Sequence, residues 1–339
     1  MLQHHPADLL AAGPDALAAA FGSPNRNPHP LADDLATAPL SRLAYAAGLT
    51  IRPQQSHEND RAVMARGMAS SDFAAALAAA SMTLANVRFN ALAEHRAFCA
   101  TVECRDFKPT EITSTGLDIE LPEVGEHGEM QTGVVLFGQG NTAQLRSYGR
   151  VLSAARQLII NDQAGMIADA VAQIGAAAAR TEAREVYAAL ESNPTLDDGE
   201  VVFHADHGNI VASAFDATSL GAAMAALRTM VLIGGNQADL AAAHLVVAAD
   251  LELAARKLVH EAGLQIVVTA SARLASGRWY LLPSPEAAPT VGVLKLKGAA
   301  QPILIEPWQE EFAYDGAAMR ARCDTGAVLV ARTLIRGGA

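Results

Sequence analysis

The longest regular pattern of apolar and polar positions runs from about Ala164 to Leu190. Apolar residues recur there with a period near 3.6, at Met166, Ile167, Ala170, Val171, Ile174, Ala178 and Val186. Asn161 or Asp162 can cap its start, and Asn193-Pro194 stops it. The pattern therefore predicts one helix about 40 Å long, which is far above the usual helix of about 11–12 residues.

The pattern before this helix is strand-like and polar. Phe98–Cys104 predicts a strand, and short alternating pieces follow at Leu117–Leu121 and Gly133–Phe137. Joined through Gly125–Gly128, these two pieces predict a long β-hairpin. The hairpin is too polar to carry a core, so we expect it to need a partner surface.

After Gly199 the pattern changes to α/β. Helical periods appear at Ser219–Met230 and Asp250–Glu261. Strands are predicted at Leu245–Val247, Gln265–Thr269, Arg278–Leu282, Val291–Lys297, Pro302–Ile305 and from Ala318 onward. Gly326 is expected to break or bulge the last strand before Val328.

The first part of the chain is less regular. A short helical pattern at Ala7–Phe21 is followed by a turn-rich stretch with three prolines, Pro24, Pro28 and Pro30. Residues 1–69 therefore read as an extended arm or tether rather than a compact domain. Ser70-Ser71-Asp72 then offers helix caps, and the break around Ser81-Met82-Thr83 predicts two short helices before about Glu94.

Composition narrows the class of protein. With 51% hydrophobic but only 5% aromatic residues, a core must be filled by Ala, Leu and Val. The net charge of -11 and the lack of clustered Lys and Arg argue against a protein that grips nucleic acid. Three cysteines, the first two spaced C-x4-C, match no zinc site and suit a reducing compartment. We find no signal peptide or bilayer-spanning run and expect a soluble protein made in the cytosol, with no membrane contact.

Candidate chemistry is concentrated in one short stretch. His204, Asp206 and His207 are residue types that bind divalent cations, and a metal-dependent hydrolase built on them is the rival hypothesis. In a strand, however, residues 204 and 206 share a face while 207 points away. We favour a polar turn at a domain junction, with these side chains hydrogen-bonded to the backbone.

No other motif points to catalysis. The phosphate-binding G-x-x-x-x-G-K-[ST], the dinucleotide fingerprint and the G-x-S-x-G elbow are all absent from the sequence. Lys108 stands at the base of the predicted hairpin, whose interior from Pro109 to Arg146 contains no lysine. We assign no catalytic, cofactor-binding or metal-ligating residue and expect no cofactor.

In its order of elements, the chain resembles the major capsid proteins of tailed phages, specifically the Mu-like branch of the Hong Kong-phage capsid fold. That branch is encoded in some phages as a fusion behind a prohead protease. The resemblance covers about residues 70–336. It is carried by Ser70–Phe73, Asp106–Pro109, Leu121–Glu126, Tyr148–Ser153 with Arg156–Asp162, and Leu190–Pro194 with Phe203–Asn209.

The resemblance implies an α+β fold with six parts. They are an N-terminal extension or tether (1–69), arm helices with the first strand (70–106), an extended loop (107–147), a peripheral domain with the spine helix (148–195), an axial domain (196–302), and a return strand of the peripheral domain (303–339). Residues 1–69 match the family poorly and are expected to be a remnant of a scaffold or protease linker.

The resemblance also implies the function. We expect a structural protein, not an enzyme, that assembles with copies of itself in hexamers and pentamers into an icosahedral shell. The shell would enclose double-stranded DNA without binding it specifically. A portal, a scaffold or prohead protease and a decoration protein are the further expected partners. The expected location is the virion capsid, assembled in the host cytoplasm. The lack of a lysine inside the loop argues against covalent cross-linking.

Overall fold

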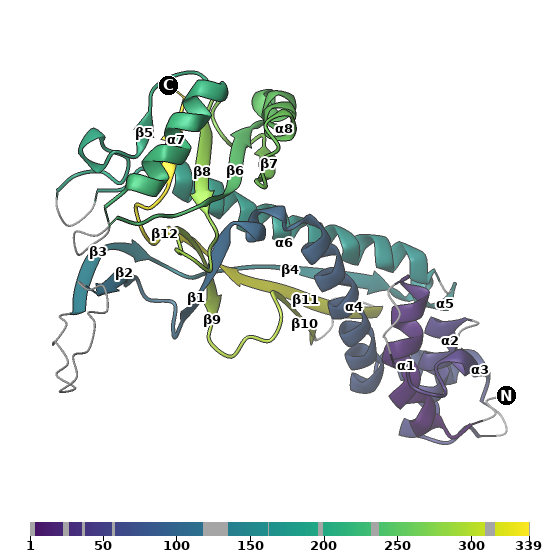
Figure 1. Cartoon of the computed structure of the whole chain (residues 1–339). Helices are drawn as coiled ribbons and strands as arrows, with labels where there is room; N and C mark the ends of the chain where they lie inside the picture. Colours follow the sequence, from purple (N-terminus) through teal and green to yellow (C-terminus); the bar gives the residue numbers. More distant parts are fainter. Residues whose placement is uncertain are drawn as a thin grey trace, which may run out of the picture. The chain divides into compact units, whose positions relative to one another are not determined.

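The computed structural model describes residues 4–22, 27–35, 38–55, 58–117, 135–161, 163–195, 199–231, 237–308 and 316–338 (Figure 1). The described chain mixes helices and sheets, as the α+β prediction requires. It divides into two compact units. Unit 1 contains residues 1–93, 147–180 and 299–324, and unit 2 contains residues 94–146, 181–298 and 325–339.

Unit 1 begins with helices that the sequence pattern did not predict as a packed group. They are α1 (Pro6–Ala20), the short η1 (Asp33–Leu35), α2 (Pro39–Ile51) and α3 (Asp60–Met68). Leu9, Leu17 and Leu43 on these helices are fully or almost fully buried. The prediction of an extended arm over residues 1–69 is therefore wrong, because these leucines pack into hydrophobic cores.

Small residues explain how α2 and α3 pack together although the segment contains few aromatic residues. A methyl group on Gly48 would collide with the carbonyl oxygen of Val63, and one on Gly67 with that of Ala44. The backbones of α2 and α3 therefore approach each other as closely as only glycine allows. Arg66 then caps the end of α2, because its guanidinium donates to the carbonyl oxygens of Gly48 (3.0 Å) and Arg52 (2.9 Å).

Helix α4 (Ser71–Leu92) is one continuous helix of 22 residues, so the prediction of two short helices is wrong. The Ser70 hydroxyl accepts a hydrogen bond from the amide of Phe73 and caps the start. The Thr83 hydroxyl donates to the carbonyl oxygen of Ala79 at 3.2 Å. Thr83 thus bonds back into the helix instead of interrupting it.

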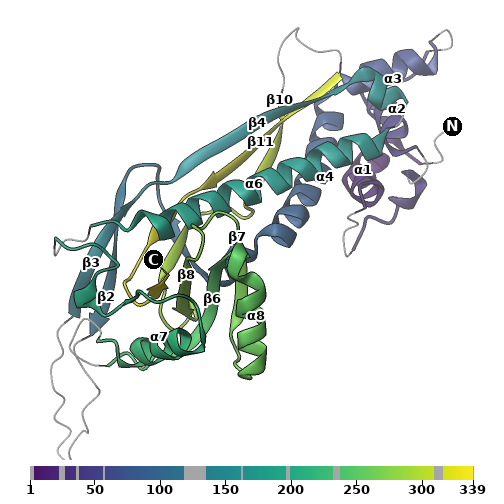
Figure 2. The same ribbon diagram turned by 90° about the horizontal axis from the view of Figure 1, so that it is seen from above.

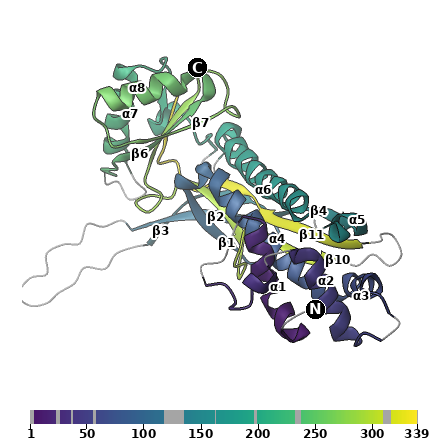
Figure 3. The same ribbon diagram turned by 90° about the vertical axis from the view of Figure 1, so that its right-hand side faces the viewer.

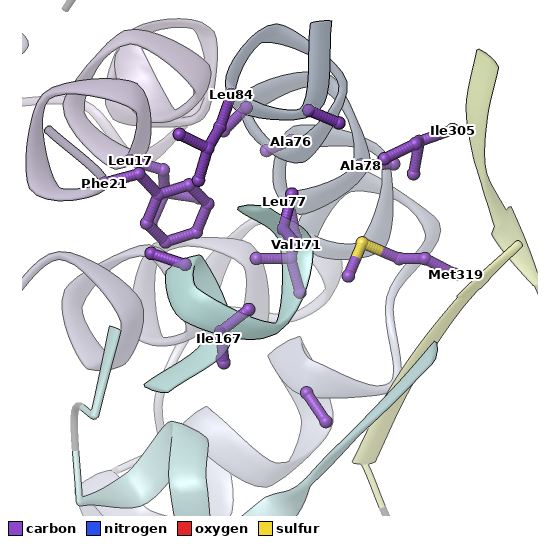
Figure 4. Close-up of a cluster of buried hydrophobic side chains, with 14 of the residues drawn as sticks. Leu17, Phe21, Ala76, Leu77, Ala78, Leu84, Ile167, Val171, Ile305 and Met319 are labelled. Atoms are coloured by element: carbon purple, nitrogen blue, oxygen red, sulfur yellow. The ribbon is translucent and has the colours of Figure 1, made fainter. Parts of the chain in front are cut away.

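A three-stranded sheet completes unit 1, in the order β10 (Ile303–Trp308), β11 (Gly316–Thr325) and β4 (Arg146–Ala155) (Figure 2). Strand β4 leads into the short helix α5 (Arg156–Ile160). One face of the sheet packs on α4 and on the first part of α6 (Ala164–Ser192), with Ile305, Met319, Leu77 and Val171 in one core (Figure 4).

Unit 2 holds the other end of α6, the β2–β3 hairpin described below and two further sheets. Parallel strands β1 (Cys99–Cys104) and β9 (Val291–Leu296), with β12 (Ala327–Leu329), form the smaller sheet. Between α4 and β1 lies the one-turn helix η2 (Glu94–Ala97). The larger sheet has the order β5 (Ile210–Val211), β13 (Ile335–Gly337), β8 (Trp279–Pro283), β6 (Ala242–Ala248) and β7 (Val267–Ser271).

Helices cover one face of this larger sheet (Figure 3). These are α7 (Ala217–Thr229) and α8 (Glu252–Glu261), the latter preceded by η4 (Ala249–Leu251). A second core, with Tyr187 and Leu190 of α6, lies against the opposite face through Tyr280 and Val246. The helices and strands predicted after Gly199 are confirmed within a few residues, including the break at Gly326.

The predicted hairpin is confirmed in its described part. Strands β2 (Thr110–Leu117) and β3 (Val135–Ala143) pair antiparallel, from Thr110 opposite Ala143 to Leu117 opposite Val135. Residues 118–121 and 133–134 of the predicted strands, the predicted turn at Gly125–Gly128, and Asp162 as a helix cap lie outside the described residues.

No single helix in the described residues has the length and apolar character to cross a membrane; only the pair α3 and α4, bent by 66°, meets that test together.

Candidate functional site

The His204–His207 stretch forms a single turn of 3-10 helix, η3 (Ala205–His207). Gly208 follows in the left-handed region (φ 63°), where glycine is favoured. The Nδ1 atom of His204 accepts a hydrogen bond from the amide of Asp206 (3.4 Å). His204 is therefore the cap of a turn, with its ring turned back on its own backbone.

Two asparagines, to which the sequence interpretation gave no role in this turn, hold it in place. Asn209 is fully buried; its amide nitrogen donates to Val202 O (2.7 Å) and its oxygen accepts from His204 N (3.2 Å). Asn193 accepts from the amide of Phe203 at 2.7 Å. The only signal in the sequence was their position, one at each end of the segment that follows the long helix.

The ionisable side chains of the turn do not converge on one point. His204 Nε2 lies 3.3 Å from Glu200 Oε2 and His204 Nδ1 lies 3.4 Å from Asp206 Oδ2. His207 Nδ1 instead faces the carbonyl oxygen of Val202 at 3.0 Å. Over the described ranges, no three His, Cys, Asp or Glu side chains gather in a way that would hold a metal ion. The hydrolase hypothesis thus finds no ligand set there to support it.

The second candidate region is the base of the β2–β3 hairpin. Ala143 and Leu145 are buried in a small core with Cys104, Leu294 and Val328. Asn141, also buried, donates its amide to Leu329 O at 2.7 Å. The base of the hairpin is therefore fastened to the sheet of unit 2. Lys108, just before it, is exposed, and its backbone amide donates to Asp106 Oδ1.

A buried carboxylate in unit 2 was also missed. Glu182 of α6 is 2% exposed and lies in contact with His95, Arg96 and Thr325. Burial alone raises the pKa of a carboxyl group, but hydrogen bonds from Arg96 and His95 outweigh it and lower the pKa of Glu182 to about 2. A signal existed in the sequence, because Glu182 stands one helical turn before the apolar Val186.

The comparison with protein families decides the class of protein. Residues 140–336 match the family described as phage capsid protein. This stretch is more than half of the chain and runs from the end of β3 to β13. The chain belongs to the phage capsid protein family. As a phage capsid protein it has a structural role, which is consistent with a His204–His207 turn held by backbone hydrogen bonds.

Solved structures of a virus-like particle and of phage capsids are similar to this phage capsid protein at low sequence identity. A virus-like particle protein from Pyrococcus furiosus is 11% identical, covers 76% of this chain and 96% of its own, and gives a TM-score of 0.44. The capsid of cyanophage P-SCSP1u is 12% identical over 72% of this chain and 88% of its own (TM-score 0.44). The procapsid of bacteriophage JBD30 is 14% identical over 77% and 74% (TM-score 0.41). Among curated proteins, none matches significantly.

Proposed function

We propose that the chain is the major capsid subunit of a tailed phage or related particle, in the Mu-like branch of the family. Copies of it would assemble as hexamers and pentamers into an icosahedral shell around double-stranded DNA. The observation that carries this proposal is the family match over residues 140–336, joined to a hairpin whose described part is a sheet of only two strands.

The hairpin supports assembly by exchange of elements between copies. In its described part, β2 pairs with β3 and forms a sheet of only two strands. An isolated two-stranded hairpin is marginally stable in water. Its base is held by the small core around Leu145, but strand pairs as far out as Leu117 with Val135 continue beyond that base. Another copy of the chain would supply the missing surface.

The sheet of unit 1 offers a surface of the right kind. Its inward face is buried in the main core, whereas on β4 Gly149, Val151 and Ser153 are all exposed. Val151 is 47% exposed and Leu304 of β10 is 38% exposed. We infer that the hairpin of a neighbouring copy lies against this face, where small side chains permit close approach of the two backbones.

The proposed roles of the segments follow the family pattern. Residues 107–147 would form the extended loop, 148–195 and 303–339 the peripheral domain, and 196–302 the axial domain. Residues 70–106 would be the arm, and 1–69 a helical extension rather than a tether. Proposed partners are the portal, a scaffold or prohead protease and a decoration protein. The net charge of -11 suits a wall that encloses DNA without gripping it.

Electron microscopy of the purified full chain tests the proposal. We expect shells or capsomers in negative stain. A monodisperse monomer under all assembly conditions would refute it.

A loop deletion tests the role of the hairpin. Removing residues 114–139 and joining Thr113 to Gly140 through an Asn-Gly turn spares Asn141 and the base of the hairpin. We expect a folded chain by circular dichroism that no longer assembles. Normal particles from this variant would rule out the hairpin as the exchanged element.

A further inference from the structure

Glu182 occupies a position that the rest of its helix gives to apolar residues. Val186 and Leu190, one and two turns later on α6, are fully buried in the core of unit 2. Glu182 lies on the same stripe and is 2% exposed. A carboxylate in such a place is retained only when strong hydrogen bonds offset the loss of water.

Both oxygens of the carboxylate are saturated by donors. Oε1 accepts from His95 Nε2 (2.9 Å) and from Arg96 Nε (2.5 Å). Oε2 accepts from Arg96 Nη2 (2.7 Å) and from Thr325 Oγ1 (3.3 Å). The arginine contact is bidentate, the strongest and most directional form of such a pair.

Each of the four residues lies at or near the start of a chain segment that belongs to unit 2. Unit 2 is built from three segments, residues 94–146, 181–298 and 325–339. His95 and Arg96 are the second and third residues of the first segment, Glu182 is the second of the next, and Thr325 is the first of the last. One carboxylate therefore joins the starting points of every segment that makes up the unit.

We propose that the Glu182 cluster is a three-way clamp that makes the starts of these segments open and close together. Each of the four hydrogen bonds of the cluster ends on the Glu182 carboxylate. The starts of the three segments therefore cannot loosen independently while the carboxylate keeps these bonds. Arg96 is where opening begins, because its side chain is 38% exposed whereas those of His95 and Glu182 are each 2% exposed. The clamp is a conformational device, and it does not depend on the proposed function.

Hydrogen exchange followed by mass spectrometry tests the clamp on the purified full chain. Glu182→Gln keeps the shape of the side chain but replaces the charged carboxylate by a neutral amide. The NH2 group of that amide cannot accept a hydrogen bond, so the four donor contacts cannot all be kept. We expect amide exchange to rise at least tenfold in residues 94–99, 181–187 and 325–329, by similar factors, with α7 and α8 unchanged. The matched control is Glu185→Gln, which alters a carboxylate paired with the neighbouring Arg184 and should change none of the three segments.

A rise confined to one segment, or an equal rise with Glu185→Gln, would overturn the clamp. If Glu182→Gln does not fold, Arg96→Lys provides the test, because lysine keeps the charge and loses the bidentate contact. A smaller rise, still shared by the three segments, supports the clamp. A rise in residues 94–99 alone, or no rise, contradicts it.

Discussion

Asn86 holds both backbone groups of Ile303. Its amide nitrogen donates to the carbonyl oxygen of Ile303 (3.0 Å), and its side-chain oxygen accepts from the amide of Ile303 (3.1 Å). One buried side chain on α4 therefore acts as a strand partner for the start of β10. The contact fixes β10 against the helix across 217 positions of sequence.

Replacing Asn86 by Ala should strongly destabilise the protein. Two buried backbone groups of Ile303 would lose their partners, at about 1–3 kcal/mol each. Denaturant unfolding followed by circular dichroism measures the loss, with Asn90→Ala on the exposed side of α4 as the control. Equal stabilities of the two variants would show that the Ile303 contact is unimportant.

Acid should weaken the native protein in a way that depends on Glu182. Its pKa in the folded protein, about 2, is below the ordinary 4.5, so its stabilising effect is present above pH 4.5 and is lost as the pH falls toward 2. A shift of this size corresponds to about 3 kcal/mol. The charged and titratable groups facing it are Arg96 and His95 from η2 and Cys99 from β1.

The measurement is the melting temperature between pH 5 and pH 2.5 for the native chain and for Glu182→Gln. We expect the variant to be less stable at pH 5 and to show a shallower decline with acid. Parallel curves would mean that other carboxyl groups dominate the acid response.

Glycine substitutions should separate tight packing from open positions. Gly48→Ala and Gly67→Ala each place a methyl group against backbone of the facing helix, so we expect losses of about 2 kcal/mol or more. Gly221→Ala on α7 meets nothing within 4 Å and should be neutral or stabilise by up to about 1 kcal/mol. Thermal unfolding compares them, and a well-tolerated Gly67→Ala would disprove the close approach of α2 and α3.

Asn209 should matter more than the histidines beside it. Asn209→Ala removes the side-chain hydrogen bonds with His204 N, Val202 O and Arg332 O from a fully buried site. His204→Ala and Asp206→Ala instead change partly or largely exposed side chains. We expect a loss of about 2 kcal/mol for Asn209→Ala and less than about 0.5 for Asp206→Ala. A melting temperature that rises with added Zn²⁺ and falls with chelator would instead revive the metal hypothesis.

A charge placed on the exposed face of β4 should block assembly without unfolding the subunit. Val151→Lys puts an ammonium group where the proposed contact needs an apolar one, and Val151→Thr is the matched control of similar shape. We expect shells from the threonine variant and soluble subunits from the lysine variant, as measured by sedimentation. Shells from both variants would show that the contact between copies does not use this face of β4.

Periodicity located the elements whose apolar positions repeat without interruption. The helix from Ala164 and the strands between Val267 and Ile305 were predicted within a few residues because burial dictates their pattern. Strand β4 was not predicted. Its exposed face carries Gly149, Val151 and Ser153, so its sequence does not alternate between apolar and polar residues. Residues 1–69 were misjudged for a different reason. Gly48 and Gly67 bring the backbones of α2 and α3 close together, and a pattern of apolar positions does not reveal such contacts.

In the candidate site, too, the residue pattern indicated the location, whereas contacts with the backbone determine the structure. The His-Ala-Asp-His letters drew attention because their side chains are ionisable, yet the structure fixes the turn through Asn193 and Asn209. Their partners are backbone groups of Val202, Phe203 and His204, and no residue-type pattern announces such bonds. Glu182 was detectable in principle, but its partners come from segments 87 and 143 positions away.

The interleaving of the two units has a consequence for synthesis on the ribosome. Unit 1 needs residues 299–324 to close its sheet, and unit 2 needs residues 325–338 for β12 and β13. Neither can finish folding while those residues are still inside the ribosome, although the helices before residue 93 are free to form early. Folding of both units is thus completed only after translation has passed this region.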